Sequence, residues 1–584
     1  MIAAVFPATA AYDAGMRAGR RVSAVMVMVM GVVVVCGALL LSATGSRAVS
    51  AGQEAGRGPV LTFYFGLKRP ESRAVAAFWA VQQPGSATYR RFLTTAEIAR
   101  RYGASTATRR AFIVSMRRLG LTASIDPSGV FARVNGTKSQ LERAFHVKIT
   151  GTFDDLSTSY ATNRPPRLPA AVRPLVREVV ATFVRTTVPP GSALAPLHHV
   201  ASGPKNAGRW TRGCAAARRT GGYSFDQIRR AYGIDQVGAG AGGSVAILND
   251  QETTSLSDNA ALNRCFGYPA HRVRSLFTDR QTHRFLPETP EPAEDLGLVR
   301  GIAPQLRSVV QTEVWGAPAL WFLGPARLLR QSRLPDVLSV SYGYCERDVM
   351  SVPVERVGAR LLNAMFVRLG LAGVGVFGSA GDSGSTCNGM PFRGTAWPAD
   401  SPYVTSVGGT RLVVNRSNHR VGEVVWNDLR WLKPAHGGGA GGGGLSNVYQ
   451  RPPYQRSIGV PGNRRATPDI AVHASMLPGY PVLANGQWVE DGGTSAAAPL
   501  AAAAFTALDA RLQAAGQPPL GPVNGLVYWL QRHHPSSLYD IVSGNNQYDR
   551  HVPGYRAHRG YDLASGVGVP RFSRIAGIVP APGR

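Results

Sequence analysis

Residues 491–500 read Asp491-Gly-Gly-Thr-Ser-Ala-Ala-Ala-Pro-Leu500, and this stretch decides how the chain is interpreted. Its two glycines allow another backbone segment to approach closely, and the serine at position 495 follows them. The alanine-rich run 496–505 predicts a helix that begins at or beside Ser495, with Pro499 tolerated in its first turn. A hydroxyl at the positive end of a helix dipole suits a nucleophile that leaves an oxyanion behind. Taken alone, the stretch fits an N-capping serine in a packing turn equally well.

Three carboxyl groups complete a candidate catalytic set. Glu291 and Asp295 stand four residues apart in segment 290–304, so a helix there places them one turn apart on one face. Like charges at that spacing disfavour double ionisation, and one carboxyl tends to keep its proton. Asp382 follows the apolar run 371–377 in a glycine-rich turn. None of the twelve histidines lies in an H-G-T-H-like segment, which a subtilisin-type base would need.

This set of one serine, one glutamate and two aspartates, without a histidine, resembles the catalytic set of the sedolisins, or serine-carboxyl peptidases. From about residue 58 onward the chain is similar to a kumamolisin-like precursor of that family. The resemblance implies that Ser495 is the nucleophile, that Glu291 is its base and that Asp295 orients Glu291. It also implies that Asp382 donates a hydrogen bond to the oxyanion. A carboxylate base has an unperturbed pKa near 4, against about 6.5 for histidine, so we expect an endopeptidase that acts on polypeptides in acid.

The C-terminal region resembles the calcium site of the same family. The resemblance implies one structural Ca²⁺. Its ligands would be the side chains of Asp540 and Asp562 and the backbone carbonyls of Ile541, His558 and Gly560. Hard oxygen ligands in a glycine-containing loop suit Ca²⁺. The alternative is an unrelated loop closed by an Asx-turn.

The expected fold is α/β, with a subtilisin-like parallel sheet flanked by helices and an α+β prodomain before it. Strands are expected at 245–248, 337–340 and 374–377, alternating with helices such as 355–369. The prodomain is expected over 58–187, with a strand at 60–65 and a helix at 107–119. Its segment 89–99 resembles the Y-x-x-F-L-T-x-x-E motif of the family's activation domain. Such a domain is expected to act as an intramolecular inhibitor.

Two glycine-rich segments carry further expectations. The Pro/Gly/Arg-rich residues 188–221 are expected to form the linker that is cut, and residues 222–584 the peptidase domain with its C-terminal calcium loop. Residues 437–444 are nearly all glycine. The resemblance places them along the substrate cleft, and the alternative is a flexible insertion.

Residues 1–57 are expected to form a targeting segment with a short spacer. The uncharged stretch 22–46 follows three arginines and is near membrane-spanning length, so it predicts either a cleaved signal or an uncleaved anchor that attaches the protein to the membrane. Either outcome implies a secreted or cell-envelope protein. Four cysteines remain outside this segment, an even number that suggests two disulfides. Neighbouring parallel strands favour Cys345 with Cys387, which leaves Cys214 with Cys265, although the sequence alone does not fix the connectivity.

The net charge of +29 raises the question of a nucleic-acid partner. We expect none, because the basic residues are scattered, they are mostly arginine, and no nucleic-acid-binding motif accompanies them. Two other function classes stay open at this stage. One is a weak or inactive exported binding protein on the sedolisin fold, and the other is a serine hydrolase whose histidine base comes from elsewhere in the chain.

Overall fold

The computed structural model describes residues 60–153, 157–186, 203–250, 253–269, 272–278, 289–314, 318–434, 437–579 and 582. Residues 58–584 form one compact unit. The apolar segment 22–46, with its expected signal or anchor, lies outside the described residues. Within the described ranges, no helix is both long and apolar enough to cross a membrane.

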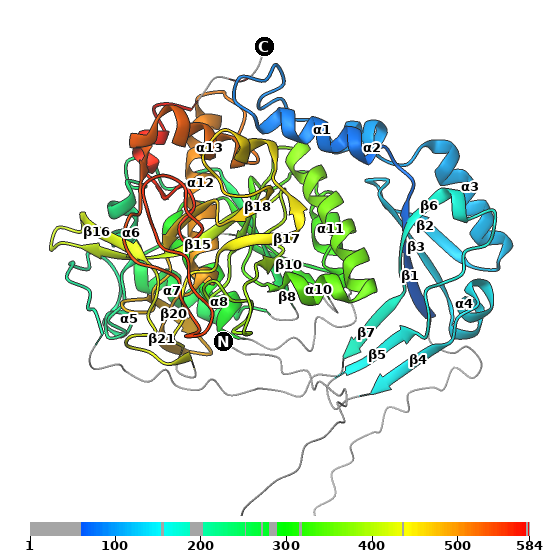
Figure 1. The fold of residues 1–584 in the computed structure, drawn as a ribbon, viewed down its shortest axis with the longest axis horizontal. Helices are drawn as coiled ribbons and strands as arrows, with labels where there is room; N and C mark the ends of the chain where they lie inside the picture. Colours follow the sequence, from blue (N-terminus) through cyan, green and yellow to red (C-terminus); the bar gives the residue numbers. More distant parts are fainter. Residues whose placement is uncertain are drawn as a thin grey trace, which may run out of the picture. The chain divides into compact units, whose positions relative to one another are not determined.

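A mostly parallel sheet organises the C-terminal part of the chain (Figure 1). Its strand order is β16-β15-β13-β11-β8-β10-β9, with β19 paired beside β15. Among these described strands, β16 alone runs antiparallel to its neighbour. The predicted strands 245–248, 337–340 and 374–377 are confirmed. The observed bounds are β8 (Ser244–Asp250), β9 (Arg272–Phe277), β10 (Ser308–Val314), β11 (Val337–Val340), β13 (Gly375–Ser379), β15 (Thr405–Val414), β16 (Arg420–Val425) and β19 (Ile470–His473).

Both faces of this sheet are buried, because side chains alternate between two separate cores. In β8, Val245 and Ile247 belong to one core, and Ala246 and Leu248 to the other. The first core is covered by α8 (Pro290–Ile302) and by the alanine-rich α12 (Thr494–Ala514), which pack against each other. The second is covered by α9 (Leu323–Leu328) and α11 (Pro353–Leu371), the latter confirming the helix predicted at 355–369. The α/β layering expected from the sequence is therefore present.

The N-terminal part is a separate α+β fold. Its antiparallel sheet has the order β2-β3-β1-β6 and carries its own apolar core, and a smaller sheet has the order β4-β5-β7. The predicted strand and helix appear as β1 (Val60–Leu67) and α3 (Thr106–Arg118). The other elements are α1 (Glu71–Gln82), α2 (Thr95–Tyr102), β2 (Thr122–Ile125), β3 (Phe131–Thr137), α4 (Lys138–Phe145), β4 (Ile149–Phe153), β5 (Ser157–Thr162), β6 (Val176–Val180) and β7 (Thr182–Thr186). Within the motif 89–99, Thr94 and Glu97 form a reciprocal capping box that starts α2.

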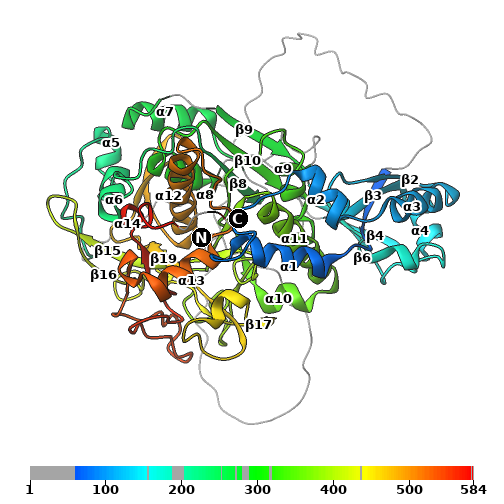
Figure 2. The ribbon, with the colours of Figure 1, turned by 90° about the horizontal axis from the view of Figure 1, so that it is seen from above.

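Helix α1 joins this N-terminal fold to the C-terminal part, where it packs against α11 and α13 (Asn524–His533) (Figure 2). Phe78 shares an apolar cluster with Val367 and Leu371 of α11. The ring of Trp79 stacks on that of Tyr403 with their centroids 5.4 Å apart. The two parts therefore share a packed apolar contact. They are also joined by hydrogen bonds, such as the one from the Arg368 guanidinium to the Tyr102 carbonyl at 2.9 Å.

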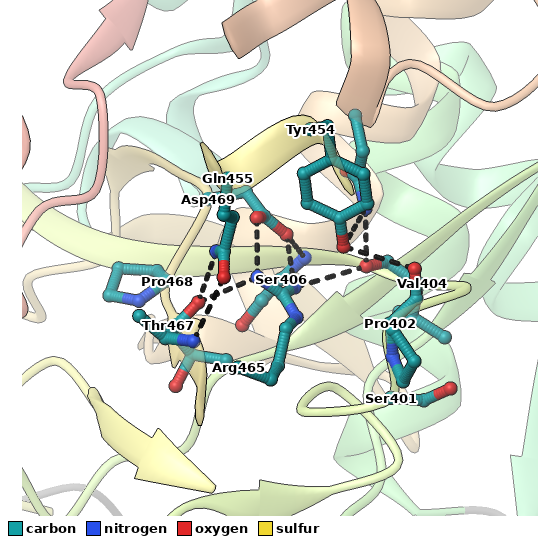
Figure 3. A network of polar contacts seen from close by, with 12 residues as sticks. Ser401, Pro402, Val404, Ser406, Tyr454, Gln455, Arg465, Thr467, Pro468 and Asp469 are labelled. Carbon is teal, nitrogen blue, oxygen red and sulfur yellow. Dashed lines mark hydrogen bonds and ion pairs between the residues drawn. The ribbon is translucent and has the colours of Figure 1, made fainter. Parts of the chain in front are cut away.

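A buried ion pair ties the sheet to the C-terminal loops (Figure 3). The Arg465 guanidinium binds both carboxylate oxygens of Asp469, with Nη1 2.6 Å from Oδ1, and neither side chain is exposed. Asp469 also accepts from the backbone N–H of Ser406 at 2.8 Å and from the Tyr528 hydroxyl at 2.9 Å. Its own carbonyl accepts from the N–H of Val567 at 2.8 Å. Both carboxylate oxygens of Asp469 therefore accept hydrogen bonds, which offset part of the cost of burying the ion pair.

Both expected disulfides are present. Cys345 is bonded to Cys387, and Cys214 to Cys265. Cys214 lies in the predicted linker, whose described residues 203–221 contact the C-terminal part. Trp210 Nε1 donates to the Gly222 carbonyl at 3.0 Å, and the backbone N–H of Arg209 donates to Asn418 Oδ1 at 2.9 Å. Residues 187–202 of the linker lie outside the described residues.

Candidate active site

Ser495 is the second residue of α12, which begins after Gly493 at a φ of 104°. Its side chain is half-buried, and Oγ donates to the Ser341 carbonyl at a long 3.4 Å. The sequence placed Pro499 in the first helical turn, but it lies deeper, inside the helix. Because proline has no N–H, it leaves the Ser495 carbonyl, four residues earlier, without a helical donor. The Ser341 hydroxyl lies 3.2 Å from that carbonyl and shares its single proton between it and Asp295, whose Oδ1 is closer at 2.6 Å.

The predicted helix containing Glu291 and Asp295 is confirmed as α8, in which Glu291 lies in the first turn. Asp295 is fully buried, and its Oδ1 accepts a 2.6 Å hydrogen bond from the Ser341 hydroxyl. Glu291 is half-buried. The two predicted carboxyl groups therefore share one helix, and Asp295 is linked to the backbone of Ser495 through Ser341.

Asp382 lies in the turn after β13 and contacts the residue that precedes Ser495. Its Oδ1 accepts from the backbone N–H of Thr494 at 2.8 Å and from the Thr494 hydroxyl at 2.6 Å. The other oxygen, Oδ2, faces Gly493, where a Cβ atom would lie only 2.8 Å away. Burial raises the pKa of Asp382, against the two hydrogen bonds from Thr494. A protonated Asp382 would therefore carry its proton on Oδ2.

Ser341 and Thr494 hold the site together, although the sequence analysis assigned them no role. Ser341 comes directly after β11, at the carboxyl end of a parallel strand, where ligands commonly bind in such sheets. Its position directly after a predicted strand could have indicated Ser341 from the sequence. Thr494 was visible in the quoted motif, but the partners of its hydroxyl, the Gly381 N–H and the Asp382 carboxylate, come from a turn that is distant in the sequence.

Glu294 is a further carboxyl that the sequence analysis passed over. It lies on α8 between Glu291 and Asp295, and only 2% of its surface is exposed. Its pKa is raised well above the usual range, first by burial and then by the nearby charges of Asp491, Glu291, Asp295 and Asp382. Oε1 has no hydrogen-bond donor among the described residues. Burial therefore favours the neutral form of Glu294, which lies next to the predicted catalytic carboxyls.

The glycine-rich run is a packed part of the site. Residues 438–444 are buried, and the backbone N–H groups of Ala440 and Gly442 donate to the carbonyls of Asp382 and Gly381 at 3.0 and 2.7 Å. A Cβ atom at Gly442 would lie 2.0 Å from the Ala380 carbonyl oxygen. Only glycine allows this approach. The alternative of a flexible insertion is wrong for this buried stretch, which runs along the backbone of the Asp382 turn.

The five predicted calcium ligands gather in one loop region. The backbone N–H of Gly560 donates to Asp540 Oδ2 at 3.0 Å, and that of His558 donates to Asp562 Oδ2 at 3.2 Å. Asp562 is buried, and this burial raises its pKa against several backbone donors. Ile541 is adjacent to Asp540. No group of three or more acidic, histidine or cysteine side chains suited to a metal occurs in the described ranges. The predicted set needs only two such side chains and takes its other oxygens from the backbone, so the residues fit Ca²⁺.

His473 is a candidate for the alternative histidine base. His473 is fully buried, and its Nδ1 accepts from the backbone N–H of Leu412 at 3.1 Å while Nε2 lies 2.8 Å from the Pro478 carbonyl. Burial lowers its pKa to about 4. Both ring nitrogens are thus occupied away from Ser495, whose hydroxyl contacts the Ser341 carbonyl.

Comparisons with known proteins lead to the same family that the sequence resembles. The pro-kumamolisin activation domain family matches residues 48–183. Kumamolisin from Bacillus sp. (strain MN-32) is 29% identical over 460 residues, covering 76% of this chain and 78% of that protein. Sedolisin from Pseudomonas sp. (strain 101) is 25% identical over 534 residues, covering 88% of this chain and 86% of that protein.

A solved structure extends the likeness to the fold. Pseudomonas sedolisin, a serine-carboxyl proteinase complexed with two molecules of pseudo-iodotyrostatin, superimposes with a TM-score of 0.56 at 24% identity. The match covers 62% of this chain and 99% of that one. Together, the relatives support a serine peptidase that is made as a zymogen. The chain belongs to the sedolisin family of serine-carboxyl peptidases, as a kumamolisin-like precursor with an activation prodomain.

Proposed function

We propose that the protein is an exported, self-processing endopeptidase that works in acid, with Ser495 as nucleophile and Glu291 as base. The Ser495 hydroxyl attacks the carbonyl carbon of a peptide bond while its proton passes to Glu291. Glu291 then returns the proton to the leaving amine. Water next attacks the acyl-enzyme while its proton passes to Glu291, which returns that proton to the Ser495 oxygen as the acid product leaves. Asp295 orients Glu291 from the next turn of α8, and Ser341 holds Asp295 in place.

The observation that carries this proposal is the contact between Asp382 and Thr494. It brings a buried carboxyl next to the start of α12 and uses Oδ1 as an acceptor, so that Oδ2 is left to hold a proton. A protonated Oδ2 can donate to the oxyanion of the tetrahedral intermediate. Burial raises the pKa of Asp382 and so favours this neutral form in acid.

Several finer features belong to the same proposal. Residues 58–187 act as the intramolecular inhibitor, and the cut falls in the linker. A cut before residue 203 leaves the described contacts of 203–221 in place, including the disulfide of Cys214. Residues 22–46 direct export to the cell envelope or the medium, either as a signal or as an anchor. Nucleic acid is not a partner.

One structural Ca²⁺ is also part of the proposal. It would be held by the side chains of Asp540 and Asp562 and by the carbonyls of Ile541, His558 and Gly560. When bound, the ion would supply charge that holds the C-terminal loop closed, and no catalytic step passes through it.

Acidification of the purified full chain tests the function. We expect a loss in size that matches removal of the prodomain, together with the appearance of peptidase activity. Ser495→Ala should show neither change while keeping its circular dichroism spectrum and cooperative melting. Processing by purified Ser495→Ala would refute the assignment. A folded wild-type chain that stays intact and inactive at every acidic pH would instead favour a binding protein on the same fold.

A further inference from the structure

Glu346 and Asp400 are two carboxyl groups that the proposed mechanism does not use, and both side chains are fully buried. Glu346 begins α10 (Glu346–Ser351), directly after the disulfide-bonded Cys345. Asp400 lies in the turn between β14 (Ala396–Trp397) and β15. The two carboxyl groups flank Thr395, whose carbonyl accepts from the Glu346 N–H at 3.0 Å and whose hydroxyl donates to Asp400 Oδ2 at 2.9 Å. At this position the charge of Glu346 and a hydrogen bond between the two side chains contribute to the raised pKa of Asp400.

The remaining oxygens of the pair are bound to neutral donors. Glu346 Oε1 accepts from the Ser446 hydroxyl, and Oε2 accepts from the backbone N–H of Asn447 at 2.7 Å. Asp400 Oδ2 accepts from the Thr395 hydroxyl at 2.9 Å, whereas Oδ1 receives no donor from the described residues. Ionised carboxylates only accept hydrogen bonds, so a hydrogen bond between Glu346 and Asp400 requires a proton on one of them.

Few charges face this pair. Burial raises the pKa of Asp400 well above its usual range, and the charge of Glu346 raises it further, against Thr395 and the Arg465 guanidinium. Arg465 is already bound to both oxygens of Asp469. From β17 (Gly444–Gln450), Tyr449 faces the pair, and burial holds its pKa well above the usual range.

Other neighbours of the pair are neutral or point to solvent. From α11, Asn363 contacts the Tyr449 hydroxyl at 3.0 Å and accepts from Ser401 at 2.7 Å. The charged residues next to Glu346 on α10, Arg347 and Asp348, are exposed. A second negative charge in the pair would therefore be poorly compensated.

The pair holds the far end of a segment that begins at the predicted oxyanion donor. Segment 439–447 starts beside the Asp382 turn, where the N–H of Ala440 donates to the Asp382 carbonyl at 3.0 Å. It then continues into β17, whose Ser446 and Asn447 donate to Glu346. Its position is therefore fixed at one end by Asp382 and at the other by Glu346.

We propose that Glu346 and Asp400 share one proton and thereby position segment 439–447 against the Asp382 turn. While the proton is present, Glu346 stays in place and holds Ser446 and Asn447. When rising pH removes it, two buried negative charges repel each other and the segment is released. The structural part stands by itself, whereas the consequence for catalysis rests on the proposed function.

Hydrogen exchange tests the structural part without reference to activity. The full chain carrying Ser495→Ala serves as the parent, because it stays unprocessed at every pH. We expect the protection factors of amides 444–450 to fall as pH rises from 4 to 8, by up to about tenfold per pH unit once the proton is lost. Adding Asp400→Asn should abolish that fall, because its amide N–H donates to Glu346 at every pH. Glu346→Gln is the second variant, and its amide donates to Asp400 in the same way.

Glu355→Gln is the matched control. Glu355 is another carboxyl, on α11, whose pKa burial raises to about 7, and the backbone hydrogen bond that opposes this rise comes from Ala319. Its replacement should leave the exchange of 444–450 as in the parent. The proposal is overturned if the parent keeps constant protection from pH 4 to 8. It is also overturned if Asp400→Asn and Glu346→Gln both fold and both lose protection as the parent does.

A second measurement separates this proposal from the proposed function. With Ser495 intact, Asp400→Asn should extend peptidase activity to higher pH. Exchange that responds as expected in a chain without activity would refute the catalytic proposal alone. Activity in acid together with pH-independent exchange would refute the shared proton alone.

Discussion

Asp382 holds Thr494, the residue before the predicted nucleophile, through a single carboxylate oxygen. Oδ1 accepts from both the backbone N–H and the hydroxyl of Thr494, at 2.8 and 2.6 Å, while Oδ2 faces Gly493. This division of roles separates the two functions of the carboxyl group. One oxygen fixes the start of α12, and the other remains available as a proton donor toward the oxyanion.

The first prediction follows from that division. Asp382→Asn should keep activity within about tenfold of wild type, whereas Asp382→Ala should lose about a hundredfold to a thousandfold in kcat, as expected for removal of an oxyanion donor. The amide can accept from Thr494 through its oxygen and donate through its nitrogen at any pH. Asp382→Asn should therefore also extend activity to higher pH. The measurement is kcat against pH for the processed enzymes.

The pH dependence of kcat distinguishes wild type from Asp382→Asn. The pKa of Asp382 is raised by burial, so the wild-type donor is present at low pH and is lost as pH rises through that value. If a folded Asp382→Asn variant is as inactive as Ser495→Ala, the donor role is wrong.

The second prediction concerns Ser341, whose hydroxyl contacts Asp295 and the Ser495 carbonyl. Ser341→Ala should lower the free energy of unfolding by about 1.5–3 kcal/mol, because a buried carboxylate loses a donor. It should also lower kcat by about tenfold to a hundredfold, because Asp295 is no longer fixed. Urea unfolding and steady-state kinetics measure the two effects.

Ser339→Ala is the control for that variant. Ser339 lies two residues earlier on β11 and is equally buried, but its hydroxyl has no partner among the described residues. Its removal should change kcat by less than about twofold, since no hydrogen bond is lost. Equal losses for both variants would mean that Ser341 contributes only general packing.

The third prediction uses Glu294 and the pH dependence of stability. Its pKa is raised well above the usual range, so the unfolded chain releases this proton at a lower pH than the folded one. The stability it contributes is therefore complete below its ordinary pKa and is lost as pH rises, by about 1.4 kcal/mol for each unit that separates the two values. Glu294→Gln should raise the Tm at pH 7 and leave the Tm nearly unchanged at pH 3.5.

An exposed carboxyl provides the comparison for Glu294. Asp235 is exposed and pairs with Arg230 at the surface, so Asp235→Asn should change the Tm little at either pH. Calorimetry of the Ser495→Ala chain avoids self-digestion during heating. A Tm for Glu294→Gln that shifts equally at both pH values would show that Glu294 does not titrate differently on folding.

The fourth prediction addresses calcium. Chelation should lower the Tm of the processed protein, and Asp562→Ala should lower it without chelator, because an ion bound only to the folded state stabilises it by mass action. Activity below the melting transition should change little. Asp549→Ala, in the same loop region but outside the predicted ligand set, is the control and should keep its response to calcium. A wild-type Tm that is indifferent to chelator would exclude a stabilising ion.

Local patterns determined much of the fold. Apolar runs at 245–248, 337–340 and 374–377 indicated parallel strands because such strands are buried on both faces, and each run is confirmed. The four-residue spacing of Glu291 and Asp295 indicated one helical face, and α8 confirms it. Pro499 marks the limit of this reasoning. Inside α12, the carbonyl that the proline leaves without a helical donor lies 3.2 Å from the Ser341 hydroxyl, which comes from a distant strand end.

The sequence by itself indicated the parallel α/β fold, because short apolar runs and their spacing are local features, and its resemblance to the sedolisins implied the candidate catalytic residues. Only the tertiary structure decided their partners. Ser341 is 46 residues from Asp295 and 154 from Ser495, and Ser446 is 100 residues from Glu346. Hydrogen bonds of that kind depend on how strands and helices pack in three dimensions, and no local pattern encodes them. The roles of Ser341, Glu294 and the Glu346–Asp400 pair therefore became visible only in the folded chain.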